Sequence, residues 1–218
     1  QPTLTLDINT LGVGRILEAI KSYSPNSHFY QASSAKILDE PQDPYSISKS
    51  AAHLLVKAFR NNFKLFACSG IMYNHESVRR GPEFVTRKIT LGAVKIKLGL
   101  EKTLALGNLD ARQDWGYAPD YVAAMWLMLQ QDQPDDYTIA SGQLHSVRDI
   151  CDIAFSHLNL NYQDFVTMDP AFFRPAAVSP AVGDAAKAKK VLDWQPKTSF
   201  KDMIITMVNH DLKEIQHG

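Results

Sequence analysis

Two residues four positions apart, Tyr45 and Lys49, have side chains that could together transfer a proton. Positions i and i+4 lie on one face of an α-helix, so the phenol and the ammonium would be neighbours there. A nearby cation favours the phenolate form, and such a phenol can exchange a proton with a substrate hydroxyl while a hydride moves to or from a nicotinamide. The spacing alone is a weak signal, because Tyr and Lys also occur four apart on ordinary solvent-exposed helix faces.

A serine upstream of this pair strengthens the hypothesis. The short apolar run from His28 to Ala32 predicts a strand, and Ser34 follows its carboxyl end. Open α/β sheets bind ligands in the crevice outside the carboxyl ends of their strands. Ser34 could therefore hydrogen-bond the same substrate oxygen as Tyr45. The alternative interpretation is that Ser34 is an ordinary turn serine without a role in binding.

The elements that must position these residues alternate between helix and strand. Apolar residues at helical spacing predict helices over residues 5–23 and 45–63, and apolar runs predict strands over 28–32 and 64–73. The second run is almost continuous, which is typical of a strand covered on both faces. We therefore predict an α/β protein with a doubly wound parallel sheet.

The glycines near the start of the chain do not form a phosphate-binding loop. Gly12 and Gly14 lie inside the first helical pattern, so close helix packing explains them better than phosphate binding. A doubly wound nucleotide domain normally opens with strands and a Gly-rich turn that are missing from this sequence. We therefore expect the sequence to be part of a longer chain.

The later chain predicts a smaller mixed lobe. Helices are predicted over 82–98, 119–131, 146–158, 185–192 and 199–215, and short strands over 103–106 and 136–140. Ser146 has the right type and place to cap the helix that follows it. We expect residues 1–80 to form the remainder of a dinucleotide-binding domain, with some later segments returning to it, and residues 81–218 to form mainly a substrate-binding lobe.

Bulk composition excludes several classes of protein. The 218 residues include 23 Lys and Arg and 23 Asp and Glu, so no net charge attracts nucleic acid or an anionic membrane. Cys68 and Cys151 stand in apolar surroundings, which favours two buried reduced thiols over a disulfide or a metal site. No metal-ligand spacing and no apolar run of membrane-spanning length is present. These features fit a cytoplasmic enzyme.

Further motifs give the Tyr45–Lys49 pair a family context. The Asn74-His75-Glu76-Ser77 stretch with Arg79 and Arg80 is far more specific than the pair itself. The sequence resembles the GDP-mannose 4,6-dehydratase family of extended short-chain dehydrogenases/reductases over essentially its whole length. The matching segments are Phe29 to Ser34, Tyr45 with Lys49, Tyr73 to Gly81, Phe84 to Ile89, Gly107 to Ala111, Asp114 to Gly116, Asp120 to Val122, His145 to Arg148, Phe173 to Pro175 and Gly183 to Trp194.

The resemblance implies a Rossmann-like fold and a role for each matching polar residue. Ser34, Tyr45 and Lys49 would be catalytic, and Tyr45, Lys49, His75 and Arg80 would contact NADP, with NAD also possible. The expected substrate is a GDP-linked hexose, whose diphosphate needs cations along its path. Its expected contacts are Asn74, Val85, Lys88, Arg112 and Arg174. The resemblance also implies a lyase that assembles as a homodimer or homotetramer, and no metal.

Several residues depart from the family pattern. Lys36 stands two positions after Ser34, where an acidic residue normally handles the C5 proton of the sugar. Gln113 stands where the family usually has an Arg, and the adjacent Arg112 could take over its role. Ala177 replaces a Glu. Ser179 and Leu4 replace an Asp and a Tyr, and the segment between Ser34 and Tyr45 is shorter than in the family.

These departures leave three functions open. The first is a GDP-mannose 4,6-dehydratase or a close sister enzyme, which oxidises C4 and then removes water. The second is a nucleotide-sugar epimerase or reductase, which needs Tyr45 and Lys49 but no acidic residue at position 36. The third is an inactive homologue that serves as a binding or scaffold protein, and the intact Tyr45–Lys49 pair argues against it.

Overall fold

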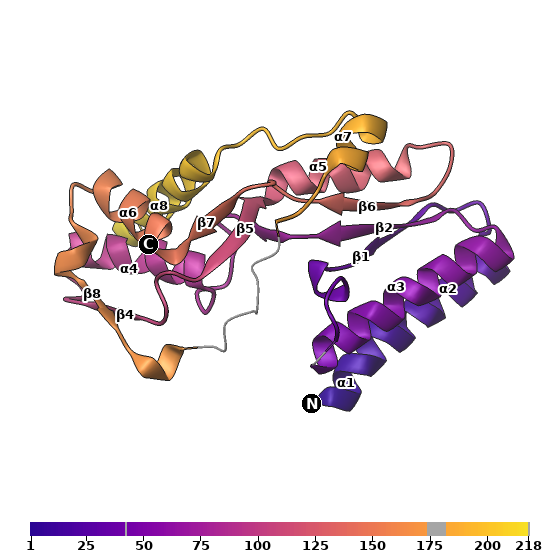
Figure 1. The fold of residues 1–218 in the computed structure, drawn as a ribbon, viewed down its shortest axis with the longest axis horizontal. Helices are drawn as coiled ribbons and strands as arrows, with labels where there is room; N and C mark the ends of the chain where they lie inside the picture. Colours follow the sequence, from indigo (N-terminus) through magenta and orange to yellow (C-terminus); the bar gives the residue numbers. More distant parts are fainter. Residues whose placement is uncertain (42, 174–181, 218) are drawn as a thin grey trace. The chain divides into compact units, whose positions relative to one another are not determined.

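The computed structural model describes residues 1–41, 43–173 and 182–217, and these form two compact units that alternate along the chain. The first unit contains residues 1–73, 121–140 and 183–195, and the second contains 74–120, 141–182 and 196–218. Figure 1 labels their helices and strands. Among the described residues, no helix is both long and apolar enough to cross a membrane.

The first unit is built on a three-stranded parallel sheet. Its strands are β1 (Phe29–Ala32), β2 (Ala67–Met72) and β6 (Asp136–Ile139), in the order β1-β2-β6. Phe29 pairs with Ala67, and Ser69 pairs with Asp136. Parallel neighbours require crossover connections, and α3 (Pro44–Phe63) supplies the one between β1 and β2. The predicted parallel α/β sheet is therefore confirmed.

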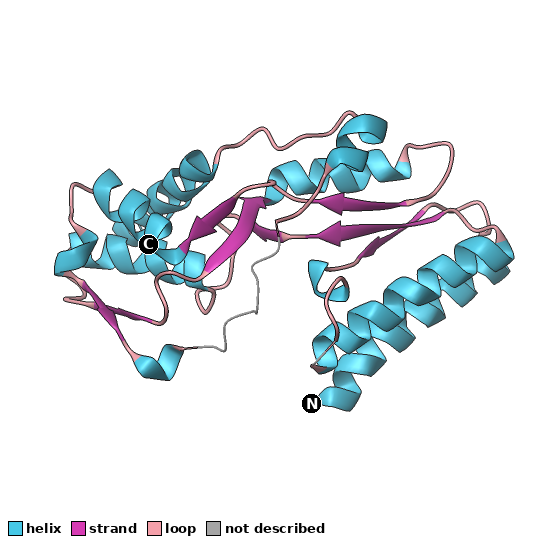
Figure 2. Cartoon of the chain, viewed as in Figure 1, coloured by secondary structure: helices cyan, strands magenta, loops and turns pink. Residues whose placement is uncertain are grey.

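Helices cover both faces of this sheet. On one side lie α2 (Gly12–Tyr23) and α3, and on the other lie α5 (Ala118–Leu129) and α7 (Ala186–Leu192) (Figures 1 and 2). Neighbouring residues of β2 point to opposite faces, so Ala67 packs with α2 and α3, while Cys68 packs with α5 and α7. The near-continuous apolar run of β2 follows from this double coverage, as the sequence predicted.

The predicted first helix is longer than expected and changes its winding. Helix α1 (Pro2–Leu6) continues through a π-helical turn at Asp7–Leu11 into α2. Gly12 and Gly14 lie inside α2, as predicted, and a β-carbon at Gly14 would stand 3.8 Å from Leu55 of α3. This glycine therefore faces the neighbouring helix, in agreement with a packing role.

The second unit combines a small mixed sheet with three long helices. Strands β3 (Asn74–Glu76) and β5 (Arg112–Tyr117) are parallel, and β7 (Leu144–Ser146) is antiparallel to β5. A separate parallel pair joins β4 (Leu104–Leu106) to β8 (Val166–Met168). Helices α4 (Val85–Lys97), α6 (Val147–His157) and α8 (Phe200–His217) pack around one apolar core. Ser146 caps α6 through a capping box, as predicted.

The sequence predicted most helices within a few residues but missed β3, β5, β7 and β8. Each of these strands is short or rich in polar residues, as Asn74-His75-Glu76 shows, so it has no apolar period to read. Cys68 and Cys151 are both buried, as predicted, and neither takes part in a disulfide among the described residues. Burial raises the pKa of each thiol to about 12.

Candidate active site

The start of α3 fixes the position of Tyr45. Asp43 caps the helix: its carboxylate accepts hydrogen bonds from the backbone N–H groups of Tyr45, at 2.8 Å, and Ser46, at 2.9 Å. Ser46 returns a bond to the Asp43 backbone, and Pro44 presets the first turn. Tyr45 therefore lies in the first helical turn, and the residue is 46% exposed and accessible to a ligand.

Lys49 lies one turn further along the same face of α3. Its ammonium donates to the Ala32 carbonyl at 3.0 Å and stands 5.7 Å from the centre of the Tyr45 ring. Ala32 is the last residue of β1, so this bond joins the helix to the carboxyl end of the sheet. Gln31 donates to the same carbonyl at 3.2 Å. Burial lowers the pKa of Lys49.

Ser34 follows the same strand end. Its hydroxyl accepts from the backbone N–H of Lys36 at 3.2 Å and caps a short 3₁₀ turn, Ala35–Ile37. This turn packs against α3, so Ser34, Tyr45 and Lys49 belong to one region of the first unit. Lys36, at the family's acidic position, is exposed.

Strand β3 of the second unit carries Asn74 and His75. Asn74 is exposed, and its amide donates to Gln113 Oε1 at 3.2 Å on the neighbouring strand β5. His75 pairs in register with Gly116. Gln113 is thus engaged with a predicted substrate-binding residue, while Arg112 leaves the opposite face of the strand because successive side chains alternate. The side chains of Arg112 and Gln113 therefore point to opposite faces of β5.

Arg80 is held at the turn between β3 and α4. Its Nε lies 3.2 Å from the carboxylate of Glu76, and its guanidinium covers the Phe84 ring at 3.6 Å. Glu76 is 2% exposed and accepts from the Thr86 hydroxyl at 2.6 Å. Burial raises the pKa of Glu76, against the opposing effects of Thr86 and Arg80. A cation presented in this way can bind an anionic ligand.

Val85 and Lys88 begin helix α4 on one face, three positions apart. The Lys88 ammonium lies 3.7 Å from the centre of the Phe172 ring, which is half exposed. The segment that carries Phe172 lies close to the end of β4, because a β-carbon at Gly107 would collide with the Phe172 carbonyl oxygen. The absence of a side chain at Gly107 thus allows the approach that brings Phe172 to Lys88.

Each unit therefore gathers one set of the predicted residues. The first unit contains Ser34, Tyr45 and Lys49; the second contains Asn74, His75, Arg80, Val85, Lys88 and Arg112. Arg174, Ala177 and Ser179 lie outside the described residues. Sequence reasoning gave no role to the supporting residues Asp43, Glu76 and Phe172, although Glu76 stood within a matching motif. Of these, Asp43 had a signal, because Asp-Pro-x-Ser is a helix-start pattern.

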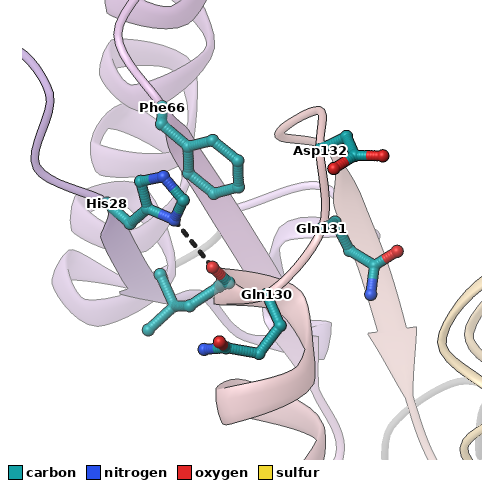
Figure 3. A pocket seen from close by; sticks show the side chains of 6 residues that line it. His28, Phe66, Gln130, Gln131 and Asp132 are labelled. Carbon is teal, nitrogen blue, oxygen red and sulfur yellow. Dashed lines mark hydrogen bonds between the residues drawn. The ribbon is translucent and has the colours of Figure 1, made fainter.

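A cavity of about 590 Å³ lies elsewhere in the first unit. His28, Phe66, Gln130, Gln131 and Asp132 line it together with Leu129, whose carbonyl is 2.7 Å from His28 Nδ1 (Figure 3). His28 stacks on Phe66 with ring centres 3.6 Å apart. The cavity borders the amino ends of β1 and β2, whereas Ser34 and Lys49 border the carboxyl end of β1, so it is not part of the candidate site.

Comparison with known proteins gives consistent relatives. The chain is 45% identical to GDP-mannose 4,6 dehydratase 2 of Arabidopsis thaliana, covering 97% of the chain and 61% of the relative. It is 38% identical to GDP-mannose 4,6 dehydratase of Homo sapiens, covering 96% of the chain and 65% of the relative. The chain thus spans about three fifths of the length of these curated relatives.

Solved structures show the same fold. RMD from Pseudomonas aeruginosa, solved with NADPH, superimposes with a TM-score of 0.91 at 21% identity, covering 98% of this chain and 76% of that one. The dTDP-glucose 4,6-dehydratase of Bacillus anthracis, solved with NAD, gives 0.84 at 21% identity over 97% and 70%. The sequence from residue 1 to residue 207 matches the family described as GDP-mannose 4,6 dehydratase, and the chain therefore belongs to that family.

Proposed function

We propose that the chain belongs to an NADP-dependent lyase that converts GDP-mannose to its 4-keto-6-deoxy derivative, with NAD as a possible substitute for NADP. The observation that carries this proposal is the Tyr45–Lys49 pair at the carboxyl end of the sheet, with Lys49 anchored on the Ala32 carbonyl at 3.0 Å. The curated relatives named GDP-mannose 4,6 dehydratase support the substrate, and the neighbours solved with NADPH and NAD support the cofactor. The comparisons do not favour an epimerase, a reductase or an inactive scaffold.

The residues present fit a nicotinamide dinucleotide. The phenol of Tyr45 is accessible, and the buried part of Lys49 is held in place beside it. Arg80 presents a guanidinium that is 29% exposed and suited to a phosphate. The proposed contacts of the dinucleotide are Tyr45, Lys49, His75 and Arg80. Asn74, Val85, Lys88, Arg112 and Arg174 would contact the GDP-linked sugar.

The chain's own residues supply the proton chemistry. Tyr45, as phenolate, would take the proton from the C4 hydroxyl, while Lys49 stabilises the phenolate charge and Ser34 hydrogen-bonds the same oxygen. A bound NADP supplies a hydride acceptor for C4 and a hydride donor for C6. The C4 ketone acidifies C5, and the proton lost from C5 and the hydroxide lost from C6 together make one water and leave a C5–C6 double bond. The hydride added at C6 is then matched by a proton returned to C5.

Lys36 bears on the dehydration step. It stands at the family's acidic position and is exposed, and an ammonium has no lone pair with which to accept the C5 proton. The proposal therefore assigns that proton to a group other than the Lys36 ammonium. The redox step at C4 is unaffected, because it depends on Tyr45 and Lys49.

We propose a different binding role for each of the two units. The first unit would be the remainder of the dinucleotide-binding domain and the second mainly the sugar-nucleotide lobe; the first segment of the first unit ends at Tyr73. Large apolar side chains are exposed along α1 to α3, and such exposed apolar surface supports a homodimer or homotetramer. A monomer in sedimentation equilibrium would contradict this oligomeric state. The exposed apolar side chains include Leu4, Leu6, Ile8, Leu11, Ile16, Ile47, Leu54 and Phe63.

A cytoplasmic location is the remaining part of the proposal. Two free, buried cysteines support a reducing compartment, in which thiols stay reduced. Cell fractionation tests it, and recovery of the protein only from a secreted or membrane fraction would contradict it.

The test is to incubate the protein with GDP-mannose and NADP and to measure the product by mass spectrometry. We expect a product lighter by one water. Tyr45→Phe should lower kcat by about 10²- to 10⁴-fold, because it removes the phenol that accepts the proton. Tyr23→Phe is the matched control, since Tyr23 is 88% exposed in the same unit and should leave kcat unchanged.

Two outcomes would contradict the proposal. Full activity in Tyr45→Phe would exclude this residue as the proton acceptor. A product of unchanged mass and altered stereochemistry would identify an epimerase instead.

A further inference from the structure

Two of the buried carboxylates in the second unit, Glu76 and Asp211, each form a group with one threonine and one arginine. In the first group, Glu76 contacts the Thr86 hydroxyl at 2.6 Å and Arg80 at 3.2 Å. We call this group the Glu76 triad. Its carboxylate is 2% exposed, while the Arg80 side chain is 29% exposed. The triad therefore reaches from the interior to the surface through one arginine.

We propose that Glu76 is a positioning residue that sets the direction of Arg80 for an anionic ligand. This inference rests on the proposed function, in which Arg80 contacts a phosphate-bearing dinucleotide. Glu76 itself touches no ligand, because it is buried beneath Arg80 and the first turn of α4. Its effect on binding would pass through the guanidinium.

The local geometry gives Glu76 this role. Arg80 stands in a turn closed by its backbone N–H on the Ser77 carbonyl at 3.0 Å, so the backbone alone does not fix its long side chain. Glu76 fixes the Nε edge, and the Phe84 ring supports the flat face at 3.6 Å. The Nε contact is an ion pair rather than an aligned hydrogen bond. Within the described residues, the terminal nitrogens of Arg80 have no protein partner and remain available to a ligand.

Thr86 completes the arrangement by fixing Glu76. It is the second residue of α4 and is 1% exposed, so its hydroxyl is held by the helix and aimed at the carboxylate. The chain of contacts thus runs from helix α4 through Glu76 to Arg80. A long arginine loses rotamer freedom when it binds a ligand, and fixing it beforehand reduces that cost.

Positioning and simple electrostatics predict opposite results. A carboxylate beside Arg80 weakens its positive field, so on electrostatic grounds alone removing Glu76 would tighten the binding of a phosphate. If Glu76 mainly positions Arg80, removing it weakens binding. The sign of the change in affinity therefore separates the two.

The experiment measures the dissociation constant of NADP by isothermal titration calorimetry, with GDP as a second ligand. Glu76→Met keeps the volume but removes the carboxylate, and we expect NADP affinity to fall about tenfold, with GDP affinity unchanged. Glu76→Gln keeps an oxygen acceptor for Thr86 and Arg80 and should recover most of the loss. In an Arg80→Ala background, Glu76→Met should cause no further loss.

Two more variants keep the test decisive. Asp211→Leu removes the buried carboxylate on α8 that contacts Thr90 at 2.7 Å and Arg87 at 2.6 Å. It should leave the NADP affinity within about twofold of the wild type, because Arg87 is only 12% exposed and is not a proposed ligand contact. Phe84→Leu changes only a partly exposed ring that makes no side-chain cap, so it should fold even if Glu76→Met does not. It should weaken NADP binding in the same direction as Glu76→Met.

The possible outcomes distinguish failure of the positioning role of Glu76 from failure of the proposed cofactor role of Arg80. Unchanged or tighter NADP binding in Glu76→Met, or a loss that adds to that of Arg80→Ala, overturns the positioning role and leaves the proposed function intact. If Glu76→Met does not fold, unchanged NADP binding in Phe84→Leu overturns the positioning role. If Arg80→Ala binds NADP as well as the wild type does, the proposed cofactor role of Arg80 fails, and the positioning role fails with it.

Discussion

Two groups in the second unit have the same three components and different exposure. The Glu76 triad joins Glu76, Thr86 and Arg80. The second group, the Asp211 triad, joins Asp211 of α8 to Thr90 at 2.7 Å and to Arg87 at 2.6 Å. The two threonines are four positions apart, so they lie on one face of α4 and each directs a hydroxyl to a buried carboxylate.

The difference lies in where each arginine goes. Arg87 has a side chain that is 12% exposed, and it also donates to the Val78 carbonyl, so the protein surrounds it. Arg80 is 29% exposed and has Phe84 on its flat face. The Asp211 triad therefore ties α4 to α8, while the Glu76 triad holds a cation at the surface. A carboxylate–threonine–arginine group thus stabilises the fold when its arginine is buried, and it is suited to ligand binding when its arginine is exposed.

The largest expected difference is in stability. Asp211→Leu leaves Arg87 buried without its carboxylate, and we expect it to lower the free energy of unfolding by about 3–5 kcal/mol. Glu76→Met should cost less, because Arg80 can turn toward water. Urea denaturation followed by circular dichroism measures both. A greater loss in Glu76→Met than in Asp211→Leu would contradict the assignment of the two triads.

The threonines offer a smaller and closely matched comparison. Thr86→Val and Thr90→Val keep the side-chain shape and remove one hydroxyl from each carboxylate, so each should cost about 1.5–3 kcal/mol of unfolding free energy. Only Thr86→Val should also weaken NADP binding, because it releases Glu76 from α4. The pair of calorimetric titrations checks this, and equal weakening by the two variants would remove the distinction.

The smallest expected effect is the pH dependence of stability. Burial, the largest influence, raises the pKa of both Glu76 and Asp211 in the folded protein. Because the folded pKa lies above the unfolded one, each group's favourable contribution is complete below the unfolded pKa and is lost as pH rises through the folded pKa. The wild type should therefore lose stability relative to Glu76→Gln and Asp211→Asn as pH rises from about 4, the usual carboxyl range. Denaturation series between acid and neutral pH measure this, and a constant difference would show that the carboxyl pKa values are not raised.

Much of the first unit was predictable because its signals are local. The period of α3 places Tyr45 and Lys49 on one face, and the apolar run of β2 indicates a strand covered on both sides. The second unit was harder to predict. Its β3 strand is polar, so Asn74 and His75 showed as motif residues but not as parts of a sheet.

The sequence by itself determined the family, the Tyr45–Lys49 pair and the alternation of helix and strand, because these follow from residue types and short periods. Only the tertiary structure decided that Lys49 is anchored on the Ala32 carbonyl and that Gln113 engages Asn74. It also decided that the buried carboxylate of Glu76 contacts Arg80. Their spacing of four resembles a helical ion pair, yet a strand end and a turn bring them together. Such contacts depend on how distant segments pack, and no local period records that packing.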